Sequence, residues 1–376
     1  MQSRTTRCGI DVAAKKLFAT RRRGGEIERQ EFANDAAGHK AVLKWTGRGA
    51  RVCMEATGVY HLQLAMALRA GGVDVMVINP RVAKDFARSL GKRSKTDKVD
   101  ADALLEYVDR MDFVAWEVPR EAVLELREHG RRIGELVQTC VEEKNRAHAK
   151  RSSRISAAIL KDVYAHIAQI EKRIAQIDTS AMNVIRSDRE LLEQYEILVG
   201  VPGVGRRSAI LLLSELAVLD RTMTVKQIVA YAGLDPRTYE SGTSVEKAPR
   251  ISRRGSARLR AILYMNALSA VRHDRGARLF HGGLILRGKK GKQALVAVMR
   301  KLLHGIWIAL QRRIAFDASV LFGASLAQAE SIDSAVAASQ PEPRQAHRNG
   351  RSAAEELRQQ LEPAGAEATR RRRKAA

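Results

Sequence analysis

The stretch RCGIDVAAKKLFATRRRGGEIERQEF, residues 7–32, decides the fold of the N-terminal part of the chain. It opens with a short apolar run that ends at Asp11, and two further runs follow with a Gly-Gly turn between them. Short runs separated by turn residues predict three consecutive strands. Helical spacing over 35–46 comes next, and strand and helix patterns then alternate to about residue 112. This order predicts an α/β sheet domain rather than a helical bundle.

Two acidic residues stand where predicted strands of this sheet end. Asp11 lies at the carboxyl end of the first strand, and Glu55 lies at the carboxyl end of the fourth, within ARVCMEATGVY at 50–60. Ligands of open α/β sheets bind outside the carboxyl ends of the strands. Both acids are therefore expected to face a site.

The stretch GKRSKTDKVDADALLEY, residues 91–107, predicts a helix that starts near Thr96. On this helix Asp97 and Asp100 share the face of the apolar positions and are expected to point inward, whereas Asp102 is expected to be solvated. Two inward carboxylates are costly without a compensating cation. The alternative is that Asp97 caps the helix and that Asp100 pairs with a lysine in solvent.

Oxygen ligands of this kind suit a hard cation. Mg²⁺ takes carboxylate ligands, keeps some of its waters and bridges phosphates. The sequence therefore predicts a magnesium site, with Asp102 outside it, formed by Asp11, Glu55, Asp97 and Asp100.

The charge of the chain favours a polyanionic partner. Lys and Arg number 66 against 42 Asp and Glu, a formal net charge of +24. Such a field favours nucleic acid and makes binding salt-dependent, although a merely soluble or ribosome-associated basic protein is the alternative. The cysteines, at 8, 53 and 140, are too scattered for a disulfide framework or a zinc site, which is typical of a reducing cytoplasm. The apolar run AILLLSELAVL is too short to span a membrane, so no membrane partner is expected.

The sequence pattern changes over residues 119–195. Apolar residues recur at threes and fours between many charges, and no proline occurs after Pro119. This pattern predicts a pair of long amphipathic helices that form an antiparallel or intermolecular coiled coil. A helical subdomain packed on its own chain is the alternative.

The stretch LVGVPGVGRRSAILLL, residues 198–213, fits a helix-hairpin-helix turn. Backbone N–H groups at such a turn and at the following helix N-terminus hold a DNA phosphate without reading bases. The predicted DNA contacts are Gly203, Gly205 and Arg206. A tight turn between two helices with no role in DNA binding is the alternative.

A turn-rich segment, LDPRTYESGTS at 234–244, precedes the basic stretch ISRRGSARLR at 251–260. Ser241 stands before a glycine and near Arg253 and Arg254, which would stabilise charge at an attacked phosphate. From the residues alone, a Ser-Gly pair in a loop is usually only a turn, and Ser244 and Ser252 are equal candidates.

Together these motifs resemble DEDD-type insertion-sequence transposases with a C-terminal serine transposase domain, the group that includes the bridge-RNA-guided recombinases. The resemblance spans roughly residues 5–275 and is carried by GIDVAAKKL, MEATGVYH, INPRVAKDFARSLGKRSKTDKVDADAL, GVPGVG and AGLDPRTYESG…ISRRG. At 240 the chain has Glu where the family often has a small polar residue.

The resemblance implies an RNase H-like, resolvase-like domain over 1–118, whose acidic tetrad maps to Asp11, Glu55, Asp97 and Asp100. It implies a coiled-coil dimerisation segment over 119–195 and a mostly helical serine transposase domain over 196–330, with Ser241 as nucleophile. It also implies donor and target DNA, a guide RNA and a homo-oligomer, either a dimer or a tetramer.

Two other functions compete with a DNA recombinase. A metal-dependent nuclease like a Holliday-junction resolvase would need only the carboxylates and water. A non-catalytic architectural protein would need only the positive surface and the hairpin. The Ala-, Pro- and Arg-rich residues 331–376 predict a disordered basic tail.

Overall fold

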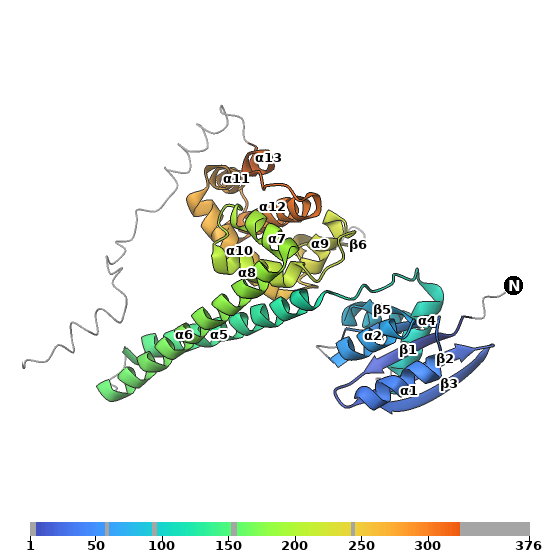
Figure 1. The fold of residues 1–376 in the computed structure, drawn as a ribbon. Helices are drawn as coiled ribbons and strands as arrows, with labels where there is room; N and C mark the ends of the chain where they lie inside the picture. The colour runs from blue at the N-terminus through green and yellow to red at the C-terminus, as the bar shows by residue number, and fades with distance from the viewer. Residues whose placement is uncertain (1–4, 57–59, 92–95, 152–155, 242–244, 324–376) are drawn as a thin grey trace, which may run out of the picture. The chain divides into compact units, whose positions relative to one another are not determined.

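The structure is a computed structural model that describes residues 5–56, 60–91, 96–151, 156–241 and 245–323, without the side chains of 151 and 238–249 (Figure 1). The chain is divided into two compact units, Met1–Glu125 and Leu126–Ala376. The tail predicted over 331–376 lies outside the described residues, and so does Ser244.

The first unit is built on a five-stranded mixed sheet of order β3-β2-β1-β4-β5. β4 runs parallel to β1 and β5, whereas β2 runs antiparallel to β1 and β3. The element order matches the prediction of three strands followed by alternating helices and strands. The elements are β1 Arg7–Val12, β2 Lys16–Arg23, β3 Glu26–Ala33, α1 Ala36–Thr46, β4 Arg51–Glu55, α2 Tyr60–Ala70, β5 Asp74–Ile78, α3 Pro80–Ser89 and α4 Asp97–Arg110.

Apolar side chains cover both faces of this sheet. On one face Ile10 and Met54 belong to a core that includes Leu64 of α2. On the other face Cys53 packs with Leu104 of α4. Burial on both faces explains why the central strands are almost continuously apolar, as is typical of parallel strands.

The second unit is mostly helical and contains one two-stranded sheet. The sequence predicted a turn-rich loop over 234–244, whereas the structure pairs residues 236–241 with residues 245–251 as two antiparallel strands. The elements are α5 Glu121–Arg151, α6 Ala157–Ser187, α7 Arg189–Val199, α8 Arg206–Leu216, α9 Val225–Ala232, β6 Pro236–Ser241, β7 Val245–Ile251, α10 Ala257–His273, α11 Arg275–Leu286, α12 Gly291–Arg312 and α13 Ala318–Phe322.

The long helices α5 and α6 lie side by side as an antiparallel hairpin (Figure 1). Lys144 Nζ lies 2.7 Å from Glu171 Oε1, and the α6 residues Ile167, Ile170 and Ile174 are buried. These contacts join two helices of the same chain. Association of two copies through this hairpin stays a prediction.

Helix α12 forms the centre of the helical core. Within the described part of the chain it is the one helix long and apolar enough to be considered for a membrane span, but 56% of its most apolar stretch is buried. Trp307 is fully buried, and its Nε1 donates to the Met223 carbonyl oxygen at 2.7 Å. α12 packs against α9, α10 and α11, so its apolar length is that of a core helix.

Candidate active site

The two strand-end carboxylates lie on neighbouring strands. β1 and β4 pair in parallel with Gly9 beside Cys53, and Asp11 and Glu55 each stand two positions further along. Because successive side chains of a strand point to opposite faces, Asp11 shares the face of Gly9, and Glu55 shares the face of Cys53. Cys53 packs against α4, so both carboxylates are on the side of the sheet that α4 covers.

Gly9 sets how closely α4 approaches the sheet. A methyl group at Gly9 would come within 2.3 Å of both the Ala101 carbonyl oxygen and the Leu105 nitrogen. The absence of a side chain therefore lets the backbone of α4 lie directly on β1. This role of Gly9 was not predicted, since one glycine in a strand does not reveal which element it contacts.

The first turn of α4 contributes two more carboxylates. Thr96 caps the helix by accepting the Val99 N–H at 3.3 Å, so the helix starts where the sequence predicted. Asp100 is half-buried, but Asp97 is exposed, which corrects the expectation that both point inward. The buried side chains of α4 begin at Ala101, because the sheet does not cover the first turn.

The surroundings of Asp11 raise the pKa of its side chain. It is raised from 3.8 to about 6, first by burial and then by the charges of Asp100, Asp97 and Glu55. Repulsion between charges weakens with distance, so all three carboxylates lie close enough to Asp11 to affect its ionisation. The structure thus brings these four residues, hereafter the carboxylate cluster, to one end of the sheet.

The carboxylate cluster fits a hard divalent cation in charge and ligand type. Carboxylate oxygens are preferred ligands of Mg²⁺, and a cation would relieve the repulsion that raises the Asp11 pKa. As placed, the described residues include no three Asp, Glu, His or Cys side chains grouped tightly enough to hold a metal. The fit is therefore one of electrostatics and chemistry.

Asp102 lies against the sheet, which corrects the expectation that it is solvated. Its side chain is 21% exposed and accepts from Thr20 Oγ1 at 2.9 Å and from Arg29 Nε at 3.0 Å. α4 covers β2 as well as β1, so a helix position beside the apolar stripe still meets the sheet. Glu106 further along α4 pairs with Arg22 of β2 in the same manner. Asp102 is therefore neutralised by a sheet arginine.

The turn between α7 and α8, residues 200–205, contains the predicted DNA contacts. Gly203 has a φ of 82°, and a methyl group there would lie 2.4 Å from the Asn266 carbonyl oxygen on α10. Gly205 is the N-cap of α8, and no described side chain caps this helix. Arg206 opens α8 and is exposed. The helix N-terminus therefore suits an anion, and DNA contact at this turn stays a prediction.

The basic stretch predicted at 251–260 passes from the end of β7 into α10, and its residues 252–256 form the basic loop between them. Arg253 and Arg254 are exposed, and Arg253 has a φ of 52°, a conformation uncommon for a residue with a side chain. The Ser252 hydroxyl donates to Asp235 Oδ1 at 2.5 Å and accepts the Arg254 N–H at 3.1 Å. Ser252, which the sequence offered as a candidate nucleophile, therefore stabilises the conformation of the loop through these two hydrogen bonds. The role of Asp235 as its acceptor was not predicted.

Ser241 is the last residue of β6, where its backbone pairs with Val245 of β7. Its side chain lies outside the description, together with residues 242–244. Thr238, Tyr239 and Val245 favour extended structure, which explains the strands beside the turn.

Two protein-family models match the chain. Residues 8–150 match the DEDD transposase model of IS110 elements, described as "Transposase". Residues 195–282 match the model described as "Transposase IS116/IS110/IS902 family". The first match contains the carboxylate cluster, and the second contains the α7–α8 turn, Ser241 and the basic loop.

Curated relatives align over most of the chain. It is 28% identical over 326 residues to the pilin gene-inverting protein of Moraxella bovis, covering 83% of this chain and 98% of that protein. It is 24% identical over 342 residues to the transposase for insertion sequence element IS1111A of Coxiella burnetii, covering 81% and 86%. The IS110 43.6 kDa protein of Streptomyces coelicolor is 30% identical over 133 residues, covering 35% of this chain and 32% of that protein.

Proposed function

Because the chain is an IS110-type DNA transposase, we propose that it cuts and rejoins DNA strands through a covalent serine–DNA intermediate, assisted by Mg²⁺ at the carboxylate cluster. The observation that carries the metal half of this proposal is the position of Asp11, a partly buried carboxylate at the end of β1 on the side of the sheet that α4 covers, where burial and three neighbouring carboxylates raise its pKa. Strained or repulsive clusters of ionisable groups are typical of functional sites.

The carboxylate cluster would hold the metal. Asp11 and Glu55 would supply ligands from the strand ends, and Asp97 and Asp100 from the first turn of α4. Mg²⁺, when bound, supplies positive charge that stabilises the attacked phosphate. The exposed position of Asp97 favours this role, because a ligand for a phosphate-bridging metal must be open to the DNA.

Ser241 is the proposed nucleophile. Its oxygen forms a bond to the phosphorus, the P–O bond to the departing strand end breaks, and the proton lost by the serine is balanced by the one that the leaving oxygen gains. The phosphoester conserves bond energy, so the strand is rejoined without ATP. Hydrolysis by water would not conserve it. The Moraxella bovis relative is named for inverting a pilin gene, which requires broken strands to be rejoined.

Backbone contacts to DNA would come from two places in the second unit. Gly203, Gly205 and Arg206 would hold a phosphate at the α7–α8 turn, and Arg253 and Arg254 would hold another from the basic loop. Contacts of this kind position DNA without selecting its sequence. Selection of donor and target would come from a guide RNA through base pairing.

The test of the nucleophile is whether cleaved DNA stays attached to protein in denaturing electrophoresis. Wild-type protein is expected to form an adduct with labelled donor DNA, and Ser241→Ala is expected to lose both adduct and recombination while still binding DNA. Ser244→Ala is the matched control, with full activity expected. Strand exchange by Ser241→Ala at the wild-type rate would contradict the serine mechanism and favour the resolvase-like nuclease.

The test of the metal site is Asp97→Asn, which keeps the size of the side chain. We expect loss of Mg²⁺-dependent cleavage with DNA affinity retained. Full activity in this variant would remove Asp97 from the site.

The partners need separate tests. We propose that the protein acts in the cytoplasm as a dimer or a tetramer. The carboxylates and the serine of one active site would come from the same copy or from two different copies. Light scattering of the DNA complex is expected to exceed the mass of one copy, and a monomer would contradict this. Recombination that is unchanged when the flanking RNA is left out would contradict RNA guidance.

A further inference from the structure

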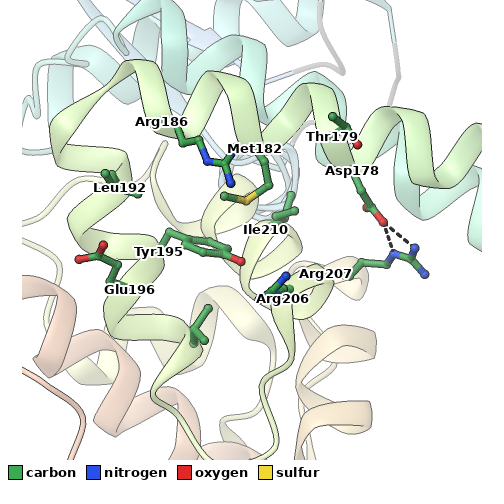
Figure 2. Close-up of a pocket in the computed structure, with 11 residues that line it drawn as sticks. Asp178, Thr179, Met182, Arg186, Leu192, Tyr195, Glu196, Arg206, Arg207 and Ile210 are labelled. Atoms are coloured by element: carbon green, nitrogen blue, oxygen red, sulfur yellow. Dashed lines mark hydrogen bonds and ion pairs between the residues drawn. The ribbon is translucent and has the colours of Figure 1, made fainter.

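A pocket of about 660 Å³ opens between α6, α7 and α8 of the second unit, beside the α7–α8 turn (Figure 2). This volume is within the range of about 300–1,000 Å³ that is typical of small-molecule sites. Its walls combine charged and polar side chains with an apolar part that comes from all three helices: Met182, Leu192, Val199 and Ile210. Of its lining residues, only Arg206 has a role in the function proposed above.

Tyr195 contributes an aromatic ring and a hydroxyl to the pocket. Its side chain is 9% exposed, and its ring lies across the pocket with the hydroxyl toward Arg206 (Figure 2). Among the described residues this hydroxyl has no hydrogen-bond partner. The hydroxyl is therefore available to donate to, or accept from, a group that enters the pocket. A ligand would contact the hydroxyl rather than the face of the ring, because the ring is mostly buried.

The charges around the pocket favour an anion at one side. Arg207 is neutralised by Asp178, whose Oδ2 lies 2.7 Å from Arg207 Nε. Arg186 and Arg206 form no ion pair with any described residue, and both line the pocket. Glu196 lines the wall on the other side of the Tyr195 ring from Arg206 (Figure 2). A phosphate is therefore favoured between the two arginines, at the uncapped N-terminus of α8.

We propose that this pocket binds one unpaired nucleotide of the DNA strand held at the α7–α8 turn. Its phosphate contacts Arg186 and Arg206, its base lies against the apolar wall at Met182 and Leu192, and the Tyr195 hydroxyl hydrogen-bonds to it. Double-stranded DNA presents its bases in a stack, so the pocket discriminates a nucleotide that has left the stack. Strand exchange creates such nucleotides. The inference rests on the proposed DNA contact at the turn, and it needs neither the carboxylate cluster nor Ser241.

The test compares two labelled duplexes that differ by one extra, unpaired nucleotide. Affinity of the full-length protein for each is measured by fluorescence anisotropy in EDTA at one salt concentration. Wild-type protein is expected to prefer the DNA with the unpaired nucleotide roughly tenfold, the scale of contacts to one base. Tyr195→Phe keeps the ring and is expected to lower this preference about threefold to tenfold through loss of one hydrogen bond. Arg186→Gln is expected to lower it as well.

Arg173→Gln is the matched control, since Arg173 is exposed on the same helix and does not line the pocket. It is expected to weaken both duplexes equally, as loss of a general electrostatic contact does. Equal affinity of wild type for both duplexes would overturn the proposal, and so would an unchanged preference in Tyr195→Phe. A preference seen with an unpaired ribonucleotide but not with a deoxynucleotide would overturn the assignment to DNA.

The same titration with Ser241→Ala separates this inference from the proposed function. A retained preference supports the pocket even if no covalent adduct forms. Adduct formation by wild type without any preference overturns the pocket and leaves the serine mechanism standing.

Discussion

Replacing Asp11 by asparagine should make the metal-free protein more stable at neutral pH. The substitution keeps the shape of the side chain and removes the buried charge at the centre of the carboxylate cluster. In wild type, ionised Asp11 is repelled by Asp100, Asp97 and Glu55 and is partly removed from water. The neutral amide of the Asp11→Asn variant would retain the packing without this repulsion.

The magnitude follows from the pKa of Asp11. The difference between 3.8 and about 6 corresponds to roughly 3 kcal/mol of unfolding free energy. Because the carboxylate is only partly buried, solvent screening reduces this to about 1–2 kcal/mol. The folded state binds the proton more tightly than the unfolded state. Stability due to protonated Asp11 is therefore complete below about pH 4 and is lost as the pH rises through about 6.

Hydrogen exchange of peptides from β1 and β4 in the full-length protein measures this locally, without assuming that both units unfold together. Comparison of wild type with Asp11→Asn at each pH cancels the intrinsic exchange rates. In EDTA, the variant should be more protected at pH 7–8, and the advantage should vanish near pH 4.

Added Mg²⁺ should reverse the order. It binds the folded state and should raise protection in wild type much more than in the variant. Protection of the variant equal to that of wild type at pH 8 in EDTA would refute the electrostatic reasoning. An equal response of both proteins to Mg²⁺ would refute the assignment of the metal to this cluster.

Three further substitutions test how the structure builds its sites. Gly9→Ala should displace α4 and lower the unfolding free energy by about 1–3 kcal/mol in a denaturant titration, because its methyl group would meet backbone atoms at 2.3 Å; unchanged stability would contradict the close packing. Asp102→Asn should lower stability by about 1 kcal/mol while keeping the Mg²⁺ dependence of cleavage, in contrast to Asp97→Asn. Gly203→Ala should cost about 2 kcal/mol and weaken DNA binding in a filter assay, whereas Gly205→Ala, with no atom within 4 Å of the new methyl group, should cost much less.

The fold of the first unit was predictable because its signals are local. The strands over 7–32 are marked by apolar runs and a Gly-Gly turn, and the start of α4 is marked by Thr96, whose side chain can satisfy a free N–H of the first turn. The β6–β7 hairpin was missed, because turn residues at its centre outweighed the short flanking strands. α12 was not singled out either, since an apolar helix in a core and one in a membrane have the same composition.

The candidate sites divide in the same way. The sequence by itself determined which acidic residues end strands and begin a helix, because strand period and helix caps are properties of neighbouring residues. The tertiary structure decided which of them act on one another. The contact between Gly9 and α4 joins segments about ninety residues apart, the pairing of Asp102 with Arg29 depends on how α4 lies across β2, and the Tyr195 pocket exists only where three helices meet. Such contacts depend on the packing of distant segments, and no period or motif in the chain encodes them locally.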